Sequence, residues 1–102
     1  MNIKFPIMIH KTNKFELQQE LLFNAMKYLG NAGFKLWCSL ASDENEWIKL
    51  NVNSAANSIS MGDGSTRKAV VELIENGFLS CSNESAMLFD FYFWGGDLNE
   101  RC

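Results

Sequence analysis

Apolar and small residues recur at helical spacing between residues 65 and 77. They form a stripe along one face of a helix: Thr66, Val70, Leu73, Ile74 and Gly77. Charged residues occupy the other face: Arg67, Lys68, Glu72 and Glu75. The pattern predicts a helix that packs on a core through its apolar face and presents its charged face outward. Glycines at 62 and 64 predict a turn before this helix, and Asn76-Gly77 predicts its left-handed end.

The segments on either side of this helix add a second helix and a hairpin. Residues 51–60 predict a short helix capped by Asn51 or Asn53, so that two helices flank the turn. After Gly77 a strand begins, residues 82–85 predict a turn, and residues 86–94 predict a second strand. Apolar residues stand on both alternating faces of the second strand, which predicts that each face is covered.

The first half of the chain predicts extended segments as well as helices. Residues 4–10 are apolar and β-prone, but the only proline, Pro6, restricts them to an edge strand or an extended arm. Residues 15–29 predict an amphipathic helix, with apolar side chains on a broad arc. The alternation of residues 47–50 predicts a short strand that pairs with the later hairpin.

A further helix is predicted over residues 31–41, after a glycine-containing break. Asn31 supplies a side chain that caps helices well. Apolar residues fill most positions of this helix, so we expect it at the centre of the fold. Trp37 lies in the middle of the helix and is predicted to be buried.

Most apolar residues of these predicted helices and strands lie in three stretches, residues 29–42, 65–79 and 89–92. On these stretches the chain resembles the winged helix-turn-helix domains of phage and plasmid replication initiators and regulators. The resemblance extends over residues 29–93. It implies an α+β, mainly helical fold in which a helix-turn-helix pair is followed by a small antiparallel β wing.

The same resemblance implies a division of the chain and a binding site. The division is an N-terminal arm, a winged helix domain and a flexible tail, at residues 1–14, 15–94 and 95–102. In such domains the second helix of the pair enters the major groove of DNA. The corresponding candidate DNA-binding residues are Ser65, Thr66, Arg67, Lys68 and Glu72.

The net charge of −3 narrows the functions that fit this fold. Domains that grip nucleic acid mainly through its phosphates are commonly basic, so binding driven by charge alone is disfavoured. The sequence therefore favours a site-specific double-stranded DNA-binding protein, a transcriptional regulator or replication-associated factor of a phage, plasmid or related element. The alternative is an acidic phage-type inhibitor of a host protein, such as an anti-CRISPR or antirepressor, on the same scaffold.

Residues that could carry catalysis or bind a metal are sparse. His10 is the only histidine and belongs to no catalytic motif, so we expect no enzyme. Cys38, Cys81 and Cys102 lack the spacing of a zinc site, and we expect no metal or other cofactor. The sequence contains no secretion signal and no apolar run long enough to cross a bilayer, which predicts a cytoplasmic protein without a membrane partner.

The N-terminal arm carries alternating apolar residues: Ile3, Phe5, Ile7 and Ile9. Together with the two-faced strand at residues 86–94, they predict either that the arm folds back on the hairpin or that two chains share these surfaces. A homodimer is favoured, because paired recognition helices suit two DNA half-sites.

Overall fold

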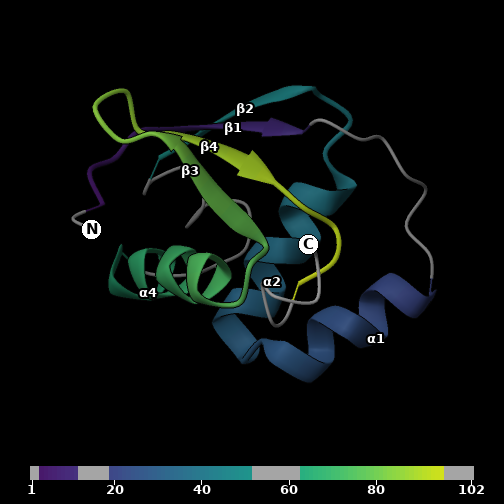
Figure 1. Ribbon diagram of the computed structural model, residues 1–102. Coiled ribbons are helices and arrows are strands. Elements are labelled where there is room, and N and C mark those ends of the chain that lie inside the picture. Colours follow the sequence, from purple (N-terminus) through teal and green to yellow (C-terminus); the bar gives the residue numbers. More distant parts are fainter. Residues whose placement is uncertain (1–2, 12–18, 52–62, 96–102) are drawn as a thin grey trace.

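The structure is a computed structural model of the 102-residue chain, and it describes residues 3–11, 19–51 and 63–95. In these ranges four strands form one mixed sheet, and three helices lie on one side of it (Figure 1). The helices are α1 (Gln19–Tyr28), α2 (Asn31–Ser42) and α4 (Asp63–Glu75). The strands are β1 (Ile7–Lys11), β2 (Trp47–Leu50), β3 (Leu79–Asn83) and β4 (Leu88–Phe91). The predicted α+β class is confirmed.

β1 lies inside the sheet, whose strand order is β2-β1-β4-β3. It pairs antiparallel with β2 and parallel with β4, so that Ile9 is aligned with Ile48 on one side and with Phe89 on the other. The prediction of an edge strand or extended arm is therefore wrong. Pro6 stands just before the first residue of β1, so its missing N–H is not needed in the ladder.

The apolar residues before and within β1 pack in the core of the same chain. Ile3, Ile7 and Ile9 are buried in the hydrophobic core. The surface that was expected to be shared between two chains is therefore used inside one chain. Of the two predicted alternatives, the arm thus folds back on the hairpin, and the homodimer stays a prediction.

β2 is a strand as predicted, but it does not pair with the hairpin. It pairs with β1, and Leu50 is aligned with Ile7 while Trp47 is aligned with His10. The prediction fails because β1 occupies the position beside β4 that β2 would otherwise take. Among the described strands, β2 and β3 form the two edges of the sheet.

β3 and β4 form the predicted antiparallel hairpin, with a bulge between Cys81 and Asn83. The turn occupies residues 84–87, whereas the sequence pattern predicts residues 82–85. The difference arises because β3 continues to Asn83. The Asn83 side chain accepts a hydrogen bond from the Ala86 N–H at 3.1 Å, which stabilises the later turn.

β4 buries only one of its two apolar faces completely. Phe89 and Phe91 are buried against the helices, whereas Leu88 on the other face is half-buried and Trp94 beyond the strand is exposed. The described helices lie on the same side of the sheet (Figure 1). The prediction that both faces are covered is therefore wrong for the part of the chain that the structure describes.

α2 lies at the centre of the fold, as predicted. Its Trp37 is fully buried, stacks against Phe34 with ring centroids 6.0 Å apart, and meets the Phe78 ring edge-on at 6.3 Å. The predicted cap is wrong, because Gly30 occupies the N-cap position and Asn31 is the first helical residue.

α4 buries the predicted stripe. Thr66, Val70 and Leu73 are fully buried, and Gly77 adopts the left-handed conformation with φ 80° that ends the helix. The Phe78 N–H then donates to the Leu73 carbonyl at 2.8 Å, which satisfies one of the last free carbonyls of the helix.

Three predicted segments lie wholly or partly outside the described residues. They are the start of the helix over residues 15–29, the first helix of the pair over residues 51–60, and the tail over residues 95–102. The described part of the first segment is α1, which confirms a helix there. The helix-turn-helix pair as a whole stays a prediction.

Lys11, the last residue of β1, is buried beneath the C-terminal end of α2. Its Nζ donates to the Ala41 carbonyl at 3.3 Å and to the Asp43 carbonyl. The same ammonium lies 5.9 and 5.7 Å from the ring centroids of Phe91 and Phe93. A cation here offsets the partial negative charge of the free carbonyls at the helix end. Lys11 thus joins the central strand to the central helix.

Replacing Trp37 with alanine should lower the free energy of unfolding by about 3–5 kcal/mol, because transfer energy is lost and a cavity remains. Trp37→Phe should cost much less. It keeps an aromatic ring and removes an indole N–H that has no hydrogen-bond partner among the described residues. Urea titrations followed by circular dichroism measure both changes. An unchanged midpoint for Trp37→Ala would contradict the central position of α2.

Replacing Lys11 with methionine keeps an unbranched side chain one atom shorter and removes its charge and its donors. We expect the free energy of unfolding to fall by about 1–3 kcal/mol, the usual range for hydrogen bonds from a charged group. Lys35→Met is the matched control, because Lys35 is exposed on α2 and should change stability by less than about 0.5 kcal/mol. Equal effects of the two substitutions would show that the contacts at the end of α2 contribute nothing.

Candidate nucleic-acid interface

The N-terminal half of α4 presents exposed residues on the side away from the core. Gly64, Ser65 and Lys68 are exposed, and no atom lies within 4 Å of the position that a Cβ on Gly64 would take. The first turn of a helix carries N–H groups without helical acceptors, and these favour anions. Among the described residues, nothing blocks the approach of a phosphate to this side of α4 at Gly64.

The hairpin turn and the segment before β1 lie at the same end of the molecule as the first half of α4 (Figure 1). A hydrogen bond from the Arg67 guanidinium to the Ile3 carbonyl joins the helix to that segment. Lys49 belongs to the same end, because it is aligned with Met8 near the start of β1. The exposed basic side chains at this end are called the basic cluster: Lys4, Arg67 and Lys68, together with Lys49 on the face of the sheet away from the helices.

Acidic residues gather at the opposite end of the sheet. Asp43, Glu44 and Glu46 belong to the connection between α2 and β2. The Lys11 N–H donates to the Glu46 carbonyl at 2.8 Å, which fixes this connection beside the far end of β1. Among the described side chains at the basic end, Glu84 in the hairpin turn is the acidic exception. The two ends of the sheet therefore carry opposite charge.

Arg67 serves the fold as well as the candidate interface. Besides its bond to the Ile3 carbonyl, its guanidinium carbon lies 5.2 Å from the centroid of the Phe5 ring. Guanidinium groups are attracted to aromatic faces at this separation. The Arg67 side chain therefore holds the segment before β1 against α4, and only part of its donor set remains directed outward.

Thr66 and Glu72 have positions that differ from those expected of DNA-binding residues. Thr66 is fully buried in the core, so it cannot reach a ligand. Glu72 is half-buried, and its carboxylate accepts a hydrogen bond from the Gly30 N–H at the start of α2. A carboxylate at a helix N-terminus stabilises the helix. Glu72 thus takes the capping role that the sequence pattern assigned to Asn31.

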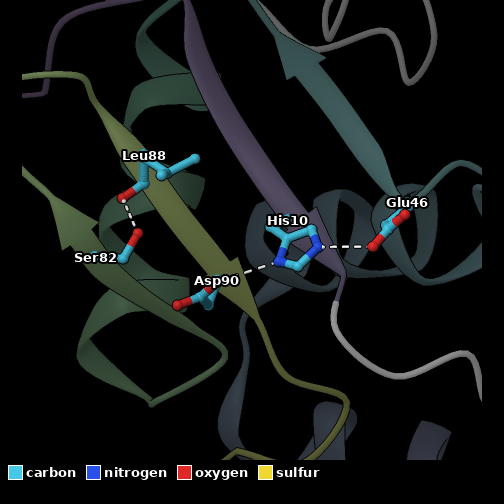
Figure 2. A network of polar contacts seen from close by, with 5 residues as sticks. All are labelled: His10, Glu46, Ser82, Leu88 and Asp90. Carbon is cyan, nitrogen blue, oxygen red and sulfur yellow. Dashed lines mark hydrogen bonds and ion pairs between the residues drawn. The ribbon is translucent and has the colours of Figure 1, made fainter.

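A second polar cluster lies on the face of the sheet away from the helices (Figure 2). His10 Nε2 is 3.0 Å from Glu46 Oε1, and His10 Nδ1 is 3.7 Å from Asp90 Oδ1. The imidazole also stacks on Trp47, with ring centroids 4.3 Å apart. Because both ring nitrogens face carboxylates, neither is directed at a hydroxyl or thiol nucleophile. The cluster links β2, β1 and β4, and sequence reasoning missed its two carboxylates because they are distant in the chain.

Other reactive groups add no chemistry to the described part of the chain. Burial raises the pKa of the Cys38 thiol, so this side chain is neutral at physiological pH and packs as a small apolar group. The described residues bring together no group of His, Cys, Asp and Glu that could hold a metal ion. None of the described helices has both the length and the hydrophobicity of a membrane-spanning segment.

Two of the five candidate DNA-binding residues remain fully available on α4, namely Ser65 and Lys68. Helical spacing located them, but it could not show that Lys4 and Lys49 lie at the same end of the molecule. That proximity depends on the position of β1 in the sheet. Comparisons of the chain with protein-family models, curated proteins and solved structures find no match.

Replacing Arg67 with alanine should lower the free energy of unfolding by about 1–2 kcal/mol, since it removes a charged donor and a cation–π contact. Lys68→Ala, one residue along the helix, should change it by less than about 0.5 kcal/mol. Urea titrations of both variants against the unsubstituted chain measure the difference. If both substitutions were neutral, the contact of Arg67 with Ile3 would not stabilise the fold.

Proposed function

We propose that this chain is a site-specific DNA-binding protein whose α4 enters the major groove of double-stranded DNA. The β3–β4 hairpin would act as the wing of a winged helix-turn-helix domain. The observation that supports the proposal most strongly is the exposed first half of α4, which shares one end of the molecule with the hairpin turn and the basic cluster. Such domains read DNA with a helix presented in this way. A transcriptional regulator or a replication-associated factor of a phage, plasmid or related element would work through this surface.

The side chains at this end divide into base-reading and phosphate-binding groups. Lys68 makes no hydrogen bond or ion pair with a described residue, so its ammonium is available to a base edge or a phosphate. Ser65, on the exposed side of the first turn of α4, has a hydroxyl that suits a phosphate. Lys4, in the segment before β1, would neutralise a phosphate beside the helix. Glu72 would support binding indirectly, by holding α4 against α2.

The charge of the chain limits how the protein binds. The basic cluster has four members, so at most about four phosphates are neutralised, and the logarithm of the affinity should fall by about 0.9 per phosphate for each tenfold rise in salt. The net charge of −3 adds no general attraction to DNA. Useful affinity then requires contacts with base edges, which makes binding selective.

A protein-binding role on the same scaffold is the second candidate. It is favoured by the acidic connection of Asp43, Glu44 and Glu46 at the end of the sheet opposite the basic cluster. Acidic side chains grouped in this way suit a partner with a basic surface, including a nucleic-acid-binding host protein. An acidic phage-type inhibitor, such as an anti-CRISPR or antirepressor, would use this end of the molecule and leave α4 free.

Selection of double-stranded DNA from a random pool with the full chain tests the proposal, followed by titration of the enriched sequence at two salt concentrations. Lys68→Ala should weaken binding by about 1–2 kcal/mol, or roughly five- to thirtyfold. Lys35→Ala is the matched control, since Lys35 is an exposed helical lysine outside the basic cluster. Because Lys68→Ala should leave the fold intact, it reports on binding more cleanly than a change at Arg67.

The salt dependence distinguishes the two roles of Lys68. If its ammonium binds a phosphate, the alanine variant should lose about one unit of the salt slope, whereas a base contact should leave the slope nearly unchanged. If no sequence is enriched from the pool, DNA binding is contradicted. Binding of basic proteins that is lost on replacing Glu44 and Glu46 with glutamine would then support the second candidate.

A further inference from the structure

α1 carries apolar residues on two opposite faces. Leu21 and Ala25 are buried against the rest of the fold, as is Leu29 just after the helix. Phe23 and Met26 are 58 % and 57 % exposed. Each residue turns a helix by about 100°, so Phe23, two positions from both Leu21 and Ala25, points directly away from the core. Exposed large apolar side chains at the centre of an outward helix face indicate a contact surface.

Two exposed charges flank Phe23 on this outward face. Glu20 precedes it by three residues and Lys27 follows it by four, so all three lie on one side of the helix. Glu20 and Lys27 are seven residues apart and therefore stand on the same flank of the face, about two turns apart. The Lys27 ammonium lies 5.2 Å from the ring centroid of Tyr28, and no described carboxylate forms an ion pair with it.

We propose that this face binds a second copy of the chain, with the two α1 helices packed antiparallel about a two-fold axis through Phe23. The charge pattern identifies the occupant. In an antiparallel pair centred on Phe23, Glu20 of each copy faces Lys27 of the other, and both ion pairs form at once. In a parallel pair the flank that carries Glu20 and Lys27 would lie on opposite sides of the interface in the two copies, so neither ion pair would form and this pair is disfavoured.

The apolar residues of the face fit the same arrangement. The two Phe23 rings meet at the axis, where aromatic pairs contribute beyond the area that they bury. Met26 follows Phe23 by three residues and Gln19 precedes it by four. In the antiparallel pair, Met26 of each copy therefore lies over Gln19 and Phe23 of the other. α1 lies at the periphery of the molecule, where a second helix can reach it (Figure 1). The dimer surface is therefore distinct from the basic cluster and independent of DNA binding.

Sedimentation equilibrium of the full chain over about 1–200 µM tests the dimer. We expect a dissociation constant of about 10–100 µM, as befits a small interface. Phe23→Asp should weaken association at least tenfold, because it places two carboxylates at the axis. Trp47→Ser is the matched control: Trp47 is an exposed aromatic residue of β2, and its loss should leave the dimer unchanged. Circular dichroism checks that each variant is folded.

Exchange of the two charges gives the more specific test. Glu20→Lys and Lys27→Glu should each weaken association by about tenfold, since each turns two attractive pairs into repulsive ones. The double variant should restore the dissociation constant to within about twofold. A chain that stays monomeric throughout, a dimer that responds equally to Phe23→Asp and Trp47→Ser, or a double variant that fails to recover would each overturn the proposal.

Discussion

The hydrogen bonding of β1 on both of its edges is the constraint on which the rest of the structure depends. By separating β2 from β4, this strand joins the hairpin to the remainder of the chain in one sheet. Its ends then attach two of the three described helices, α2 and α4, to that sheet. Lys11 at one end satisfies carbonyls at the C-terminal end of α2, and Ile3, before the other end, accepts a hydrogen bond from Arg67 of α4. A change in the register of β1 would therefore displace both helices together.

The contacts that hold α4 in place reduce the number of its charged side chains that remain available to a ligand. Arg67 and Glu72 belong to the charged face of this helix, yet both make contacts that hold the helix in place. Such contacts pre-organise a binding surface, and pre-organisation reduces the conformational entropy lost on binding. They also leave fewer free charges for the ligand. α4 is thus held rigidly and presents few side chains, which suits recognition of a defined site better than general attraction to nucleic acid.

Periodicity predicted the elements correctly where the pattern is local. The stripe from Thr66 to Leu73, the left-handed end at Gly77 and the burial of Trp37 all follow from neighbouring residues. Strand order depends on contacts between distant segments, and Pro6 misled the prediction because a proline just before a strand leaves the ladder intact. The prediction for Glu72 also differs from the structure because it misses a contact between distant segments. Helical spacing predicts that Glu72 faces outward, whereas its bond to Gly30 joins residues 42 positions apart.

An acidic chain and a DNA-binding role are compatible when the charges are separated in space. Here the basic cluster lies at the same end of the molecule as the first half of α4, and the acidic connection after α2 lies at the other end of the sheet. DNA is repelled from the acidic end, so the charge separation favours an approach with α4 foremost. α1 lies away from the first half of α4 (Figure 1), so a dimer formed through α1 would leave this part of both α4 helices open.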